Sequence, residues 1–169
     1  MCQVLVQSSY PAWPKTDESI ERVVQATLRL ESQWPASPAF GWALAPLEVS
    51  VLLSDDEAVQ ALNAQYRGKD KPTNILSFAM EEEADDAMPM PIMAGEPRLL
   101  GDLILAYQTV QREAAEQDKP FDQHLTHLLV HGTLHLLGYD HERSEDEAQQ
   151  QEAREIAILA QLGLPNPYL

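Results

Sequence analysis

The eleven residues from His131 to His141, HGTLHLLGYDH, place three histidines at the spacing of a metal site. His131 and His135 are four residues apart, so in an α-helix they share one face and lie about 6 Å apart along the axis. Gly138 can adopt the left-handed conformation that ends a helix, which lets the chain fold back and bring His141 toward the other two. All five histidines of the chain lie between His124 and His141. The pattern predicts three converging imidazoles that bind a divalent transition metal, zinc first among them.

Three histidine ligands leave the fourth position of a tetrahedral zinc open for water, which is typical of a catalytic site. Such a zinc lowers the pKa of its bound water to about 7 and polarises a carbonyl or phosphoryl oxygen. The spacing therefore indicates one zinc ion per chain and a hydrolytic reaction in which the metal-bound water attacks the substrate.

The same offsets occur in the metzincin protease pattern H-E-x-x-H-x-x-G-x-x-H, where a glutamate follows the first histidine. That glutamate takes the proton from the attacking water. In this chain the position is Gly132, which has no side chain for proton transfer. A zincin-type metalloprotease is therefore the less favoured hypothesis. Phosphodiester hydrolysis fits better because it depends more on charge stabilisation and alignment than on a strong protein base.

A locally basic segment, Arg67-Gly68-Lys69-Asp70-Lys71, stands out in a chain whose net charge is −16. An arginine can hold a phosphate through two parallel hydrogen bonds, so this segment is a candidate phosphate site. The alternative is a solubilising turn after a helix. The overall acidity argues against nonspecific binding of nucleic acid. We interpret two acidic groups as solvated surface: residues 81–86, and the set Glu142, Glu145, Asp146, Glu147, Glu152 and Glu155.

The length of 169 residues suits one domain with a hydrophobic core, so we expect a single domain over residues 1–169. Cys2 is the only cysteine, which excludes an internal disulfide and a thiolate zinc site. The first residues lack the basic and then apolar order of a secretory signal. No segment approaches the ~20 apolar residues that a membrane span needs. We expect a cytoplasmic protein without membrane association. The sequence leaves its oligomeric state open.

Hydrophobic periodicity predicts an α+β fold with the element order β-α-β-α-β-β-α-α-α. We expect a single mixed four-stranded sheet packed with about five helices and carrying a zincin-like three-histidine metal site. The expected strands are Gln3–Gln7, Leu47–Leu53, Ile75–Met80 and Leu99–Tyr107. The expected helices are Asp17–Gln33, Ser54–Arg67, Thr109–Asp118, Pro120–Leu137 and Ser144–Leu162, with capping boxes at Ser54 and Ser144. The long loop Glu81–Arg98 is hypothesised to be a flap over the groove.

With these motifs the chain resembles the YbeY family of bacterial metal-dependent endoribonucleases, which act in ribosomal RNA maturation. Residues 131–141 are similar to that family's H-G-x-L-H-L-x-G-Y-D-H pattern at every fixed position. Residues 62–73, LNAQYRGKDKPT, and residues 100–103, LGDL, resemble two further motifs in the family's order. Two positions depart from the family: Asn74 stands where an aspartate is usual and Ala79 where a proline is usual. The first departure puts any role of that carboxylate in doubt.

The resemblance implies that His131, His135 and His141 are zinc ligands and that Arg67 and His131 are catalytic, with Arg67 contacting RNA phosphate in a groove beside the metal. It implies single-stranded RNA as substrate, notably the 3′ end of precursor small-subunit ribosomal RNA, and a part in ribosome quality control. The small ribosomal subunit or a ribosomal protein is the implied partner, and an acidic body would suit a basic ribosomal protein. The alternative is a non-catalytic ribosome-assembly factor in which zinc is structural.

Five residues near these motifs are weaker candidates. His127 extends the helical stripe of the metal-binding histidines and is expected either to line the site or to be a packed, hydrogen-bonded histidine. His124 is expected at the surface near the helix start. Asp140 either orients a ligand imidazole or the attacking water, or bonds local backbone. Asp102 is expected to be a buried carboxylate with backbone partners. Tyr139 is expected to pack rather than to act in catalysis.

Overall fold

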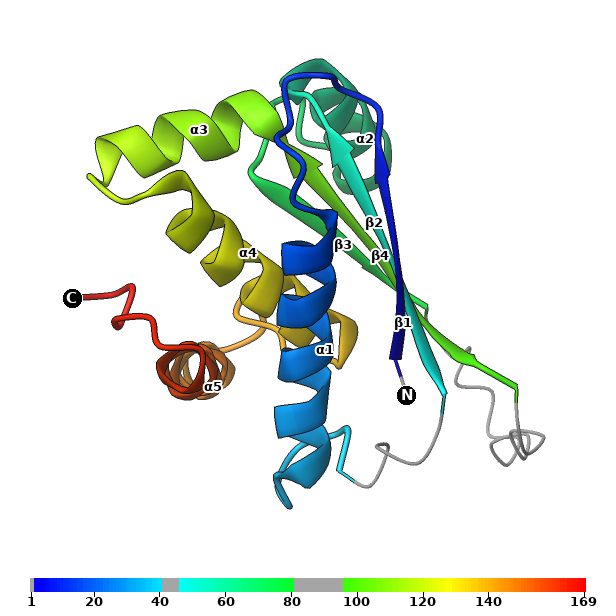
Figure 1. Cartoon of the computed structure of the whole chain (residues 1–169), viewed down its shortest axis with the longest axis vertical. Coiled ribbons are helices and arrows are strands. Elements are labelled where there is room, and N and C mark those ends of the chain that lie inside the picture. Colours follow the sequence, from blue (N-terminus) through cyan, green and yellow to red (C-terminus); the bar gives the residue numbers. More distant parts are fainter. Residues whose placement is uncertain (1, 41–45, 81–95) are drawn as a thin grey trace.

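The sheet is mixed and has four strands (Figure 1). A computed structural model describes residues 2–40, 46–80 and 96–169, and all that follows concerns these ranges. The strand order is β1-β2-β4-β3, with β2 parallel to both β1 and β4, and β3 antiparallel to β4. The bounds are β1 Cys2–Ser8, β2 Leu47–Ser54, β3 Ile75–Ala79 and β4 Arg98–Ala106. The predicted single mixed sheet is confirmed.

Five helices accompany the sheet in the described part of the chain. They are α1 Asp17–Gln33, α2 Asp56–Arg67, α3 Tyr107–Glu116, α4 Phe121–Leu136 and α5 Glu145–Gln161. The Ser144 hydroxyl accepts a hydrogen bond from the Glu147 amide at 3.2 Å, as its capping box predicts. The cap of α2 is Asp55, one residue later than predicted, and its carboxylate accepts from the Ala58 amide at 2.9 Å.

The loop predicted over Glu81–Arg98 falls mostly on residues 81–95, which lie outside the described residues. The hypothesised flap and the acidic cluster at residues 81–86 therefore lie outside them as well. Arg98, the last residue assigned to this loop, is the first residue of β4.

Helices cover both faces of the sheet. Figure 1 shows α1 and α4 to the left of the sheet, with α5 farther out beside α4, and α2 behind the upper ends of the strands. Leu103 and Leu105 of β4 pack in the core on the side of α1 and α4, whereas Ile104 and Ala106 pack with Val59 of α2. Because β4 is buried on both faces, its sequence is a nearly continuous apolar run rather than an alternating one.

Asp102 of β4 was predicted to be buried and is exposed. Successive side chains in a strand point to opposite faces, so Asp102 lies on the same face as Ile104 and Ala106. The packing of α2 covers those two residues and leaves Asp102 in solvent. The prediction failed because the apolar run indicates a buried strand but not where the covering helix ends.

Every described helix is too short or too polar to cross a membrane.

Candidate metal centre

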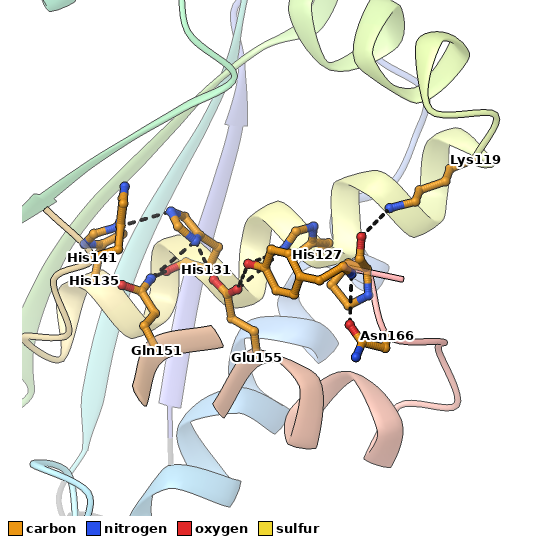
Figure 2. Close-up of polar contacts among 10 residues, drawn as sticks. Lys119, His127, His131, His135, His141, Gln151, Glu155 and Asn166 are labelled. Carbon is orange, nitrogen blue, oxygen red and sulfur yellow. Dashed lines mark hydrogen bonds and ion pairs between the residues drawn. The ribbon is translucent and has the colours of Figure 1, made fainter. Parts of the chain in front are cut away.

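Helix α4 and the turn after it bring the three predicted histidines together. Tyr139 donates its amide to the Leu134 carbonyl at 3.2 Å, and Gly138 has a φ of 100°, so the chain folds back after α4. His135 Nε2 then lies 3.2 Å from His131 Nε2 and 3.0 Å from His141 Nδ1. One ligand nitrogen from each ring lies within 4.8 Å of the others. Figure 2 shows the three rings grouped beside α4.

The donor set fits a zinc ion. Zinc–nitrogen bonds of about 2.0–2.1 Å with tetrahedral angles place two ligand nitrogens about 3.3 Å apart, close to the distances between these rings. Burial, together with the charges of the neighbouring His131 and His141, lowers the pKa of His135 to about 4. His135 is therefore neutral at pH 7, as a metal ligand must be. The structure brings together all three residues predicted to hold the metal.

Gly132 faces the sheet and not the histidine cluster. A Cβ atom at this position would lie 2.7 Å from Ile75 Cδ1, 3.0 Å from Leu103 Cδ2 and 3.1 Å from Ser77 Oγ. Helix α4 thus lies directly on β3 and β4 at this residue. A glutamate here, as in the metzincin pattern, would meet the sheet, so the geometry adds to the argument against protease chemistry.

Arg67 is the last residue of α2 and opens onto the same cavity as the histidines. Gly68 ends the helix with a φ of 68° and donates its amide to the Ala64 carbonyl at 3.2 Å. The exposed Arg67 guanidinium donates a long hydrogen bond of 3.4 Å from Nη2 to the Ser77 carbonyl. A cavity of about 310 Å³ is lined by the three histidines together with Arg67, Lys69 and Lys71. All three predicted cations therefore line the same cavity as the candidate metal ligands.

Glu155 of α5 belongs to the site, so the prediction that it is part of the solvated acidic surface is wrong. Its side chain is 0% exposed. It is hydrogen-bonded to His131 Nδ1, it accepts a hydrogen bond from the Tyr168 hydroxyl, and its Oε2 lies 3.6 Å from His127 Nε2. Figure 2 shows Glu155 and Gln151 reaching the histidines from α5. Burial raises the pKa of Glu155, but the contacts with His127 and His131 outweigh it and lower the pKa to about 2.

His127 and His124 are both packed and partnered. His127 extends the stripe as predicted, and the Tyr168 hydroxyl lies 3.5 Å from its Nε2. The expectation that His124 is a surface residue is wrong: it is 3% exposed, and its Nε2 lies 2.7 Å from Glu113 Oε2. The partner of His124 is on α3, so the sequence near α4 carries no signal for this pair.

Asn74 also binds the Glu113 carboxylate, the partner of His124. Its Nδ2 donates to Glu113 Oε2 at 3.1 Å. An aspartate at this position could not donate to Glu113 and would place two carboxylates face to face. The departure from the family pattern is therefore matched by a neighbour that needs an amide. Asn74 and His131 also line a second cavity, of about 550 Å³, on the side of Tyr168.

Tyr139 and Asp140 lie in the turn before His141, and their side chains form hydrogen bonds with other residues of the chain. The Asp140 carboxylate accepts a hydrogen bond from the Glu142 amide at 2.8 Å and lies 3.1 Å from Arg143 Nε. Of the two predicted roles for Asp140, the structure therefore shows the bond to local backbone. Tyr139 donates to Glu31 Oε2 at 2.8 Å, and Arg154 of α5 pairs with the same carboxylate at 2.6 Å. Tyr139 thus ties the turn to α1 and α5 by packing and hydrogen bonding.

A protein-family model described as Endoribonuclease YbeY matches residues 11–163. This chain belongs to that family. The match includes the three histidines and Arg67. A relative from Magnetococcus marinus, named Endoribonuclease YbeY, is 99% identical over 147 residues, which are 87% of this chain and 100% of the relative. A relative of the same name from Bradyrhizobium diazoefficiens is 44% identical over 173 residues, covering 99% of this chain and 85% of the relative.

The fold of this chain is also seen in a solved structure. The chain is similar to the solution structure of TM1509 from Thermotoga maritima, with a TM-score of 0.54 and 22% sequence identity. The similarity covers 95% of this chain and 91% of the other. At this identity the similarity concerns the fold alone.

Proposed function

We propose that this chain is a zinc-dependent endoribonuclease that cleaves single-stranded RNA. The observation that carries the proposal is the cavity in which His131, His135 and His141 face Arg67 and the two lysines beside it. Family membership supports a nuclease, because the relatives are named endoribonucleases. When bound, zinc supplies Lewis acidity, which polarises a phosphoryl oxygen and acidifies water.

The chain's own residues hold the substrate. Arg67 offers a planar fork of donors that matches two oxygens of a phosphate. Its bond to the Ser77 carbonyl directs the guanidinium over β3, beside the histidines. Lys69 and Lys71 add charge at the same wall of the cavity. These cations favour the extra negative charge that develops when a phosphodiester is attacked.

The substrate we propose is ribosomal RNA, notably the 3′ end of precursor small-subunit RNA, with a role in ribosome quality control in the cytoplasm. A net charge of −16 supports a ribosomal partner, because an acidic body would repel free RNA outside the basic cavity but attract a basic ribosomal protein. The small subunit or one of its proteins would then bring the RNA to the site.

The test pairs metal content with RNA cleavage. Zinc in the highly purified protein is measured by plasma mass spectrometry, and cleavage is measured on a single-stranded ribosomal RNA fragment. We expect about one zinc per chain in the wild type. The variant His131→Ala should lose both the zinc and the cleavage activity. Arg67→Ala should keep the zinc and lose about 100-fold or more in cleavage rate, as when an oxyanion donor is removed. Arg22→Ala, at an exposed position of α1, is the matched control and should cleave normally.

The outcomes separate the hypotheses. Zinc without cleavage by the wild type would favour a non-catalytic assembly factor with structural zinc. Unchanged cleavage in Arg67→Ala would exclude Arg67 from the phosphate site. A wild type without any metal would overturn the metal centre itself.

A further inference from the structure

We propose that Glu155 is the positioning residue for His131: it binds Nδ1 of the ring and so turns Nε2 toward the other two histidines. The proposal rests on the metal centre proposed above. A metal-binding histidine commonly donates its other ring N–H to a carboxylate, which fixes both the tautomer and the orientation of the ring. Glu155 comes from a different helix, 24 residues from His131.

The two nitrogens of His131 face different partners. Nδ1 contacts the Glu155 carboxylate, and Nε2 faces His135 Nε2 at 3.2 Å. An ionised carboxylate only accepts hydrogen bonds, so Nδ1 must donate to it, and a ring that also binds a metal through Nε2 carries its one proton on Nδ1. The lone pair of Nε2 is then left for the metal. The roles of the two nitrogens are thus assigned from the contacts that each of them makes.

Glu155 is itself held in place. The Tyr168 hydroxyl donates to its Oε2, and His127 Nε2 lies 3.6 Å from the same oxygen. The preceding residue, Arg154, is anchored to Glu31 at 2.6 Å and lies over the Trp34 ring at 4.0 Å. Since both residues are fixed on α5, the carboxylate cannot turn away from His131 without breaking buried polar contacts.

Gln151 is the alternative partner for Nδ1. Its Nε2 lies 3.3 Å from that nitrogen and 3.5 Å from the His131 carbonyl, and its side chain is buried. The Glu155 contact is shorter and involves a charged acceptor, which makes it the stronger of the two. Gln151 therefore fills the space beside the ring, while Glu155 determines which nitrogen carries the proton.

The test measures zinc affinity and, in the metal-free protein, the protonated ring nitrogen of His131. Zinc affinity comes from competition with a chromophoric chelator, and the tautomer from ¹H–¹⁵N correlation spectra of the imidazole. We expect the wild-type ring to be protonated at Nδ1. Glu155→Ala should lose this fixed tautomer and bind zinc about 10–100-fold more weakly. Glu155→Gln retains an acceptor oxygen without the charge, so its affinity should fall by about tenfold, the lower end of that range.

Glu152→Gln is the matched control, because it removes one charge from an exposed position of the same helix. It should bind zinc as the wild type does. Wild-type affinity in a folded Glu155→Ala, or a metal-free wild type protonated at Nε2, would overturn the proposal. If Glu155→Ala does not fold, a wild-type zinc affinity in Glu155→Gln would overturn it equally. A wild type that binds no zinc would refute the proposed metal centre, whereas the spectra would still decide whether Glu155 sets the tautomer.

Discussion

At the scale of single residues, Gly132 illustrates how packing limits chemistry at a site. Replacing it by glutamate would restore the metzincin pattern in the sequence. The new side chain would have to enter the contact with Ile75 and Leu103, both buried, where even a Cβ is too close. Overpacking a core costs about 1–3 kcal/mol, and a buried carboxylate adds to that cost. We expect Gly132→Glu to lower the free energy of unfolding by at least about 3 kcal/mol, measured by urea denaturation, without producing peptidase activity.

Gln161→Glu places the same carboxylate on an exposed position of α5 and serves as its control. Its stability should stay within about 0.5 kcal/mol of the wild type. A stable Gly132→Glu protein would mean that α4 can move away from the sheet, contrary to the close contact found here.

A second residue-scale prediction concerns Glu113 and pH. Burial raises the pKa of Glu113, but hydrogen bonds from His124 and Asn74 outweigh it, so the pKa lies below the ordinary 4.5. A carboxyl group with a lowered folded-state pKa adds stability that is present above its unfolded pKa and is lost as the pH falls through the folded-state value. Glu113→Gln removes this contribution. The stability difference between wild type and variant should therefore be constant near neutral pH and shrink below about pH 4.5.

Urea denaturation of both proteins at a series of pH values checks this, with Glu116→Gln, exposed on the same helix, as the control for loss of one charge. A wild-type advantage that grows as the pH falls would show that the contacts of Glu113 favour its protonated form.

The residues that the sequence could predict are those whose geometry is local. The positions of His131, His135 and His141 follow from one helical turn and one glycine turn. Glu155 could not be found in this way, because it lies among exposed acidic residues of α5 and only the packing of α5 on α4 buries it. The same holds for His124, since its partner Glu113 is on another helix.

At the scale of elements, α2 shows how a helix end presents a functional side chain. Its first turn is capped by Asp55, and its last residue, Arg67, is followed by Gly68 in the left-handed conformation. No atom lies within 4 Å of a Cβ built on Gly68, so a substitution there costs backbone strain alone. We expect Gly68→Ala to lower the free energy of unfolding by about 1–2 kcal/mol.

Gly68→Asn should cost less than Gly68→Ala, because asparagine visits the left-handed region more readily. The comparison is made by thermal or urea unfolding of the two variants. An alanine variant as stable as the wild type would mean that α2 can end in another conformation, which would leave the direction of Arg67 unfixed.

The order of the strands also belongs to this scale. Periodicity predicted the elements to within two residues, but not that β4 pairs between β2 and β3. Pairing joins segments far apart in the chain, and the apolar run of β4 indicates only that both of its faces are buried.

At the scale of the whole molecule, RNA should bind at the cavity lined by Arg67, Lys69 and Lys71 and be repelled by the acidic remainder of the protein. The chain has 27 acidic residues against 11 lysines and arginines. If Arg67, Lys69 and Lys71 contact phosphates, three counterions are released. The logarithm of the binding constant for single-stranded RNA should then fall with the logarithm of salt concentration with a slope of about −2, from about −0.7 per phosphate.

This slope is measured by fluorescence anisotropy with the metal-free protein, so that the RNA stays intact. The double variant Lys69→Gln/Lys71→Gln should bind more weakly, with a slope reduced to about −0.7, because a single cation remains. Arg22→Gln/Arg29→Gln changes the net charge equally at exposed positions of α1 and should leave the slope as it is. If both double variants changed the slope alike, RNA binding would depend on total charge rather than on this cavity. A slope near zero in the wild type would remove the phosphate contacts on which the role of Arg67 depends.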